Sequence, residues 1–215
     1  MIRFIVAHDS SDTELGTYFD DCKNQLLGIL EERSELVNGD IVQINGSQCN
    51  AAYIDIIVSH HHPHPFIFVA YSHGSEVALA SRHGNYVEKG CNSHNFKGSL
   101  FYTTACSAGK ELGPQLIDKD SCLAFVGYEG PISVHKNAEK REISKNCDNA
   151  GIIDFLINDS SIGESFKKMK DYYTSQIDRL ENVNDMLFAA ALTYARESLV
   201  CLGNRDLRKC DLFTD

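Results

Sequence analysis

Short runs of apolar residues recur along the chain, and segments with helical or polar patterns separate them. Runs that are apolar at nearly every position are typical of strands buried on both faces of a parallel sheet. Six such runs, which we assign as strands, span residues 2–7, 40–44, 66–71, 99–105, 122–128 and 199–204. Because helical segments lie between them, the sequence predicts an α/β sandwich with a mainly parallel six-stranded sheet.

The intervening segments supply the helices. Residues 13–33 carry apolar side chains at intervals of three and four, which predicts an amphipathic helix. Further helices are predicted over residues 48–59, 107–117, 149–159, 161–182 and 183–198. The polar segment 129–149 is interpreted as a long exposed loop, and its Lys and Arg residues make it a candidate self-cleavage site. No repeat or linker-like tract divides the chain, so residues 1–215 form one predicted domain.

Charge and hydropathy argue against several kinds of partner. The chain has 30 acidic and 20 basic residues, so we expect no binding to nucleic acid or to anionic membranes. No apolar run approaches the roughly 18 residues that a membrane-spanning helix needs. We see no secretory signal, and the eight cysteines include no C-x-x-C pair. The expected location is therefore the cytoplasm, with most thiols reduced.

Two reactive side chains follow neighbouring strands. His73 and Gly74 come after the strand at residues 66–71, and Cys106 comes directly after the strand at residues 99–105. In open parallel sheets the chemistry lies beyond the carboxyl ends of the strands, and adjacent strands are about 4.8 Å apart. His73 and Cys106 are therefore expected to face one reacting bond. A helix beginning after Cys106 would favour its thiolate.

These residues fit the parts of a cysteine peptidase site. His73 would serve as general base for the thiol and as general acid for the leaving amine. The backbone N–H groups of Gly74 and Cys106 would form an oxyanion hole. A single Cys at a strand end is usually a small buried apolar residue, and a single His there is usually structural. The pair, in order and followed by glycine, favours catalysis.

Cofactor and metal sites have little support. The sequence contains neither G-x-x-x-x-G-K-[ST] nor G-x-G-x-x-G, so nucleotide binding is not predicted. His60, His61, His62 and His64 are more typical of a solvated loop than of a metal site, since Pro63 and Pro65 interrupt them. His83, Cys91 and His94 lack an evident fourth zinc ligand. We therefore expect no cofactor and no metal.

Four stretches together resemble the clan of caspases, gingipains, clostripains, separases and CHAT domains. FIFVAYSHGSEVAL (66–79) resembles the strand and His-Gly of that clan, and GSLFYTTACSAGKELG (98–113) resembles its strand and Ala-Cys. SCLAFVGYEG (121–130) resembles the next strand and its pocket loop. LVCLGNRDLRKCDL (199–212) is similar to the end of gingipain-like and CHAT domains, although Asn204-Arg205 stands where Asp-Pro is usual. The resemblance implies a caspase-like three-layer α/β/α sandwich and a His73–Cys106 dyad.

The resemblance also implies a function. It suggests a cysteine endopeptidase that cleaves a protein or peptide substrate through an acyl-enzyme, regulated by an activating protein partner or signal, as in prokaryotic defence. In the clan, the residue before the cleaved bond enters a pocket that corresponds here to Asp9, Thr104 and Glu129. Since two of these are acids, the expected preference is for Lys or Arg.

Two other functions stay open. The chain could be a catalytically silent relative, a pseudo-protease that binds partners, although it retains both His73 and Cys106. It could also be a serine hydrolase that uses Ser75 or Ser107, but neither serine has the G-x-S-x-G context that such enzymes carry.

Overall fold

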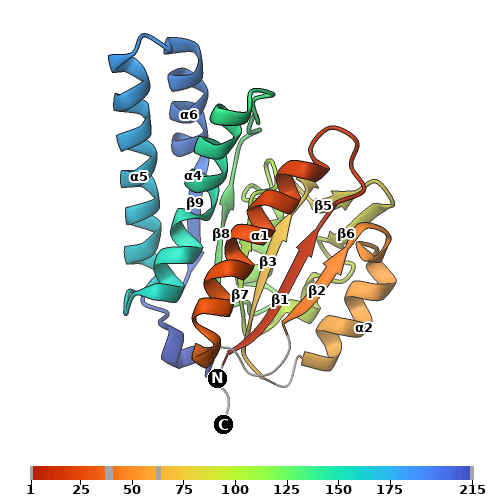
Figure 1. The fold of residues 1–215 in the computed structure, drawn as a ribbon. Helices are drawn as coiled ribbons and strands as arrows, with labels where there is room; N and C mark the ends of the chain where they lie inside the picture. The colour runs from red at the N-terminus through yellow and green to blue at the C-terminus, as the bar shows by residue number, and fades with distance from the viewer. Residues whose placement is uncertain (1, 37–40, 62–63, 214–215) are drawn as a thin grey trace.

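A six-stranded sheet forms the centre of the protein, in a computed structural model that describes residues 2–36, 41–61 and 64–213 (Figure 1). The strand order is β2-β1-β3-β7-β8-β9. The strands are β1 (Arg3–His8), β2 (Val42–Asn45), β3 (Phe66–Tyr71), β7 (Ser99–Thr103), β8 (Ala124–Tyr128) and β9 (Leu199–Gly203). Neighbouring strands from β2 to β8 pair in parallel, and β9 pairs antiparallel with β8. The mainly parallel six-stranded sheet predicted from the apolar runs is confirmed.

The reversed direction of β9 follows from the helix before it. That helix ends at Ser198, and the Ser198 carbonyl accepts a hydrogen bond of 2.8 Å from the backbone N–H of Glu129. Glu129 lies just past the carboxyl end of β8, so the chain enters β9 at that edge of the sheet. It must then run opposite to β8, and Tyr128 pairs with Leu199.

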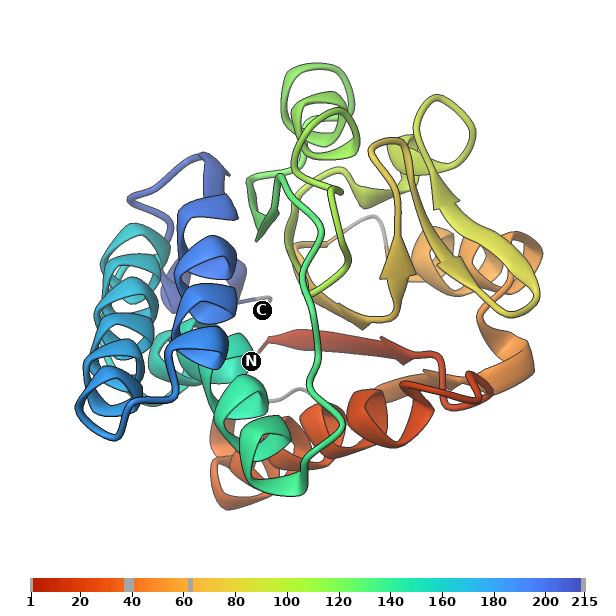
Figure 2. The same cartoon turned by 90° about the horizontal axis from the view of Figure 1, so that it is seen from above.

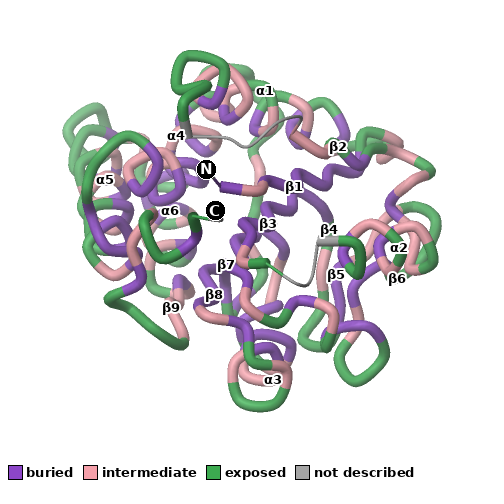
Figure 3. Tube along the Cα trace, turned by 90° about the horizontal axis from the view of Figure 1, so that it is seen from below, coloured by how far each residue is buried: buried purple, intermediate pink, exposed green. Residues whose placement is uncertain are grey.

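Helices cover both faces of the sheet, as the expected three-layer α/β/α sandwich requires (Figure 1). Along β1, Phe4 and Val6 face one core, and Ile5 and Ala7 face the other, because successive side chains of a strand alternate. The first core is covered by α1 (Gly16–Glu32), α4 (Ala138–Ile157), α5 (Ile162–Asn182) and α6 (Met186–Ser198). The second is covered by α2 (Ala51–His61), α3 (Leu112–Asp118) and a small second sheet. Figure 3 shows the buried sheet between helices whose outer surfaces are exposed.

The small second sheet was not among the predicted elements. It consists of β4 (His73–Gly74), β5 (Ala78–Ser81) and β6 (Gly84–Glu88), paired antiparallel. These strands are short, so they carry too little periodicity to be separated from a loop in the sequence. Four single turns of 3-10 helix complete the described elements, at Ser34–Leu36, Gly46–Gln48, Ser93–Phe96 and Lys209–Leu212.

The prediction of a loop over residues 129–149 is wrong for its second half. Helix α4 begins at Ala138, and the Asn137 side chain caps it by accepting a hydrogen bond of 3.1 Å from the backbone N–H of Lys140. The charged residues 139–142 are exposed or half-buried, while Ile143 and Cys147 reach the core. Only residues 129–137 form the connection between β8 and α4.

A buried carboxylate ties four elements of the first core together. Asp148 on α4 is 3% exposed and accepts hydrogen bonds from the hydroxyls of Tyr18 (2.6 Å), Tyr128 (2.5 Å) and Tyr173 (2.8 Å). Burial raises the pKa of Asp148, and the three hydroxyls offset part of that rise. We call this group the tyrosine cluster. It joins α1, β8, α4 and α5.

Candidate active site

His73 lies just beyond the carboxyl end of β3, at the edge where the parallel strands end. Its Nε2 atom is 3.1 Å from Oδ2 of Asp12, which belongs to the connection between β1 and α1. The Phe19 ring of α1 meets the imidazole edge to face, with 5.6 Å between ring centroids. The imidazole is therefore held from two sides, although 47% of its side chain is exposed.

The ionised carboxylate of Asp12 can orient the imidazole of His73. Partial burial acts to raise the pKa of Asp12, but backbone hydrogen bonds from Leu15 and Glu14, and then the His73 ring, outweigh it and lower the pKa. An ionised Asp12 accepts a hydrogen bond from Nε2–H. That arrangement leaves Nδ1 as the nitrogen free to take up a proton. Asp12 was not among the predicted site residues, because the sequence does not tell it from the other acids of this loop.

Cys106 follows β7, the strand that pairs with β3. Its thiol is half-buried, and Sγ lies 3.3 Å from the backbone N of Ile132 and 3.7 Å from the Ile132 carbonyl oxygen. The expected helix beginning directly after Cys106 is wrong: α3 starts at Leu112 and has only seven residues. A turn intervenes, with Ser107 at a φ of 59°, a left-handed conformation that stops a helix from starting there. A helix dipole therefore does not explain a reactive thiolate here.

His73 and Cys106 line one small cavity, together with the predicted pocket residue Thr104. The volume of this cavity is about 20 Å³, which is room for about one water molecule. Ser72 and apolar side chains make up the rest of its wall, namely Leu15, Tyr18, Phe19, Ile132 and Val134. The Thr104 hydroxyl is buried here, and no group among the described residues forms a hydrogen bond with it. The structure thus brings the two predicted reactive residues to one place, in a nearly filled cavity.

Gly74 occupies a position with no space for a side chain. A Cβ atom there would lie 2.7 Å from Cβ of Ala105 and 2.9 Å from the carbonyl oxygen of Cys106. The backbone of β4 therefore approaches the chain around the nucleophile closely. That proximity is what an oxyanion hole built from the N–H groups of Gly74 and Cys106 would need.

The other two predicted pocket residues lie away from the cavity. Asp9 is 0% exposed, and its carboxylate accepts hydrogen bonds from the N–H and hydroxyl of Ser11 and from the N–H of Arg82. It acts here as an acceptor that shapes the loop after β1. Glu129 is exposed and follows β8 directly, but it does not line the cavity beside Cys106.

No group of three or more His, Cys, Asp or Glu side chains gathers as a metal site in the described ranges. Of the histidine run, His62 lies outside the described residues. No helix within residues 2–36, 41–61 and 64–213 is both long and apolar enough to pass through a membrane.

Comparison with known proteins shows a similar fold and no close relative in sequence. No protein-family model matches the chain, and no curated protein is significantly similar to it. A crystal structure of the Arg-specific cysteine proteinase gingipain R is similar over 96% of this chain, with a TM-score of 0.63 and 10% sequence identity. The chain spans 47% of the length of that structure. At this identity the likeness shows the fold, which is caspase-like as the resemblance implied.

Proposed function

We propose that the protein is a cysteine endopeptidase that cleaves proteins or peptides with Cys106 and His73. One observation carries the proposal. Both side chains line the same cavity at the carboxyl ends of the paired strands β3 and β7. The fold is similar to that of a cysteine proteinase over nearly the whole chain, which supports the same reaction class.

The proposed reaction follows the chemistry of these groups. His73 takes the thiol proton, and the Cys106 thiolate attacks the carbonyl carbon of the cleaved peptide bond. The N–H groups of Gly74 and Cys106 stabilise the oxyanion of the tetrahedral intermediate. The intermediate collapses to an acyl-enzyme as His73 protonates the leaving amine. Water, deprotonated by His73, then hydrolyses the acyl-enzyme and restores the thiol.

Cleavage after Lys or Arg is the proposed preference, and it now depends on Glu129. The Asp9 carboxylate is buried and bonded to its own loop and to Arg82, so it is not offered to a substrate. Glu129 is exposed on the loop after β8, the position where the clan carries pocket residues. Its carboxylate could pair with a basic side chain. A Glu129→Gln variant that keeps the same preference would remove this assignment.

The first experiment is the digestion of a mixed peptide library by the purified protein, read by mass spectrometry. The Cys106→Ala variant is digested in parallel. Cleavage that vanishes in the variant supports the proposal, and the residue before each cut reports the preference. Cleavage that persists at the same rate in the variant contradicts the assignment of the nucleophile.

A pseudo-protease is the second candidate, and one observation favours it. The cavity at Cys106 holds about 20 Å³, and both backbone groups of Ile132 engage the sulfur. A catalytically silent protein would keep Cys106 no more reactive than its exposed thiols, Cys91 and Cys210. An active enzyme would show Cys106-dependent cleavage under at least one condition.

Substitution of Asp12 by asparagine is expected to lower kcat about 10-fold to 100-fold. The amide cannot stabilise a protonated His73, because it removes the negative charge 3.1 Å from Nε2. Asp12 Oδ1 also accepts the backbone N–H groups of Glu14 and Leu15, and asparagine keeps that oxygen. The loop should therefore hold, KM should change little, and the acidic limb of the pH–rate profile should move. Equal kcat and an unchanged pH profile would show that Asp12 has no positioning role.

Gly74→Ala is expected to reduce cleavage about 100-fold, because the added Cβ displaces the chain around Cys106. The matched control is Gly28→Ala on α1, where a Cβ meets nothing within 4 Å. That control should keep full activity and gain a little stability, since alanine is the better helix former. Activity and thermal unfolding are measured for both variants. Full activity in Gly74→Ala would contradict the close approach described here.

A further inference from the structure

Residues 131–134, which we call the strap, run across the carboxyl edge of the sheet. Figure 2 shows the connection from β8 to α4 passing over the ends of the strands. Exposure alternates along the strap: Pro131 and Ser133 are exposed, while Ile132 and Val134 are half-buried and line the cavity of His73 and Cys106. The strap is thus extended, with its inner side chains in the candidate active site.

The strap engages the nucleophile itself. The backbone N–H of Ile132 points to Sγ of Cys106 at 3.3 Å, and the thiol points to the Ile132 carbonyl at 3.7 Å. The N–H of Ile132 therefore contacts the sulfur lone pair that would attack a substrate. The carbonyl of Ile132 contacts the thiol proton that His73 would remove. The side chains of Ile132 and Val134 pack against the first core and line the cavity beside His73. These atoms occupy the space beside Sγ that a substrate carbonyl would need.

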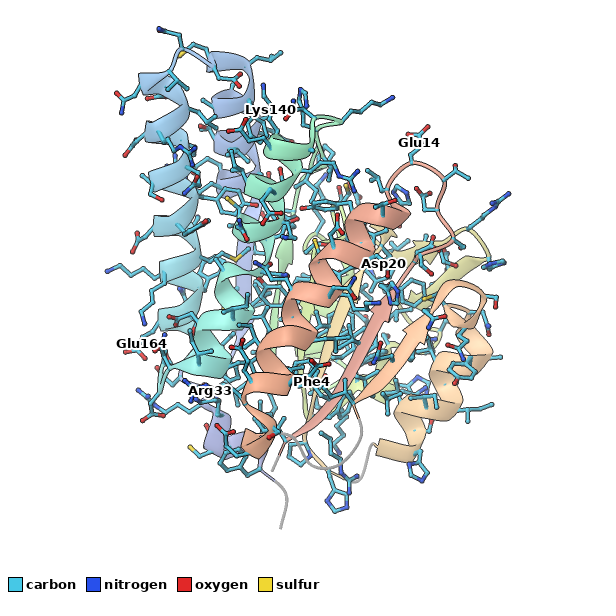
Figure 4. The ribbon with its side chains drawn as sticks, in the orientation of Figure 1. Phe4, Glu14, Asp20, Arg33, Lys140 and Glu164 are labelled. Carbon is cyan, nitrogen blue, oxygen red and sulfur yellow. The ribbon has the colours of Figure 1, made fainter. Side chains whose placement is uncertain are left out.

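Fixed points hold the strap at each end. Before it, the Gly130 carbonyl accepts a hydrogen bond of 3.0 Å from Ser107, and a Cβ on Gly130 would lie 2.6 Å from Ser198 Oγ. After it, Asn137 caps α4, and the His135 ring contacts the Phe188 ring with centroids 5.9 Å apart. Figure 4 shows Lys140, at the start of α4, and Glu14, on the loop after β1, at this same end of the molecule.

Between these points the strap is weakly attached. Among the described residues, the hydrogen bonds to residues 131–134 are the two that join Ile132 to Cys106. The strap belongs to no sheet, so it could leave the cavity without breaking a strand ladder. Its inner residues are apolar, and the cavity wall is largely apolar, so packing holds it in place.

We propose that the strap is an autoinhibitory element, with Ile132 as the plug of the catalytic cavity. In the closed state Cys106 is shielded, and the strap must move before a peptide can bind at the dyad. The shielding itself stands on the contacts above, and its meaning as autoinhibition rests on the proposed peptidase function. The expected activating partner or signal would act by displacing the strap from the cavity.

The test measures how fast each cysteine is alkylated, by peptide mass spectrometry after timed exposure to iodoacetamide and to a bulkier maleimide. Wild type is compared with Ile132→Ala and Ile132→Asp, the second of which places a charge that an apolar cavity rejects. Ile56→Ala is the matched control, since Ile56 is 69% exposed on α2. The exposed thiols Cys91 and Cys210 are internal standards. Their unchanged rates, with an unchanged circular dichroism spectrum, establish that each variant is folded.

We expect Cys106 to be alkylated at least 10-fold faster in both Ile132 variants relative to the standards, with a larger gain for the maleimide. Ile56→Ala should match wild type. Equal alkylation rates of Cys106 in wild type and in both folded variants would overturn the proposal that the strap shields Cys106. Peptide cleavage separates the two proposals. Faster alkylation of Cys106 without any peptide cleavage supports shielding by the strap and refutes the peptidase function. Peptide cleavage by wild type, with unchanged alkylation in the variants, refutes only the shielding by the strap.

Discussion

Replacing Cys106 with alanine is expected to reduce peptide cleavage about 1,000-fold or more. The substitution removes the sulfur atom that would form the acyl-enzyme in the proposed reaction. What remains is substrate binding and the oxyanion donors, which in comparable enzymes give only a small residual rate. Initial rates are compared on a peptide that the library digestion identifies.

Two controls make this result specific. Cys91→Ala removes an exposed thiol far from the chemistry in the sequence and should leave the rate unchanged. Cys106→Ala and Cys91→Ala are also each combined with Ile132→Asp. These double variants repeat the rate comparison in a protein whose strap is displaced from the cavity. If Cys106→Ala retained the wild-type rate in both backgrounds, the nucleophile would lie elsewhere and the proposed function would fail.

Replacing Asp148 with alanine is expected to cost about 3 kcal/mol of folding free energy. The substitution leaves the hydroxyls of Tyr18, Tyr128 and Tyr173 buried without their acceptor, and each such loss costs about 1–3 kcal/mol. The total is reduced because a buried, destabilised carboxyl is also removed. Since domains of this kind are stable by about 5–15 kcal/mol, the variant should fold but unfold at a clearly lower denaturant concentration.

Urea unfolding at neutral pH measures the cost, and Asp171→Ala is the matched control. Asp171 is an exposed residue of α5, so its loss should change stability by less than about 0.5 kcal/mol. A loss below about 1 kcal/mol in Asp148→Ala would mean that the tyrosine cluster adds little to the stability of the core.

The Asp148→Asn variant tests whether the stability contribution of Asp148 rises or falls with pH. The folded state raises the pKa of Asp148 above the ordinary value of 3.8, chiefly through burial, so the folded protein holds this proton more tightly than the unfolded chain. The contribution of Asp148 is therefore fully present below pH 3.8 and is lost as the pH rises through the folded pKa. Asparagine cannot ionise. The stability of wild type relative to Asp148→Asn should fall as the pH rises above 3.8, and an opposite slope would contradict the raised pKa.

Local sequence patterns are sufficient to specify the sheet and the positions of the two reactive residues. Continuous apolar runs such as residues 66–71 bury both faces of a strand, so the pattern specifies a covered parallel sheet without knowledge of contacts. Strand ends are local features, which is why the sequence pattern alone assigns His73 and Cys106 to one edge. The small sheet β4-β5-β6 and the start of α4 were not predicted, because strands of two to five residues and a polar first helical turn carry little periodicity.

Tertiary contacts, in contrast, select the loop residues that serve the site. Asp9 and Asp12 lie three positions apart in one loop, yet Asp9 turns to the Ser11 and Arg82 N–H groups while Asp12 meets His73. The contact of Ile132 with Cys106 joins residues 26 apart in the chain. Such choices depend on loop path and on unpaired backbone groups that need partners, and neither is encoded in a local pattern. Periodicity determines which segments are buried, whereas the surrounding fold determines which side chains meet.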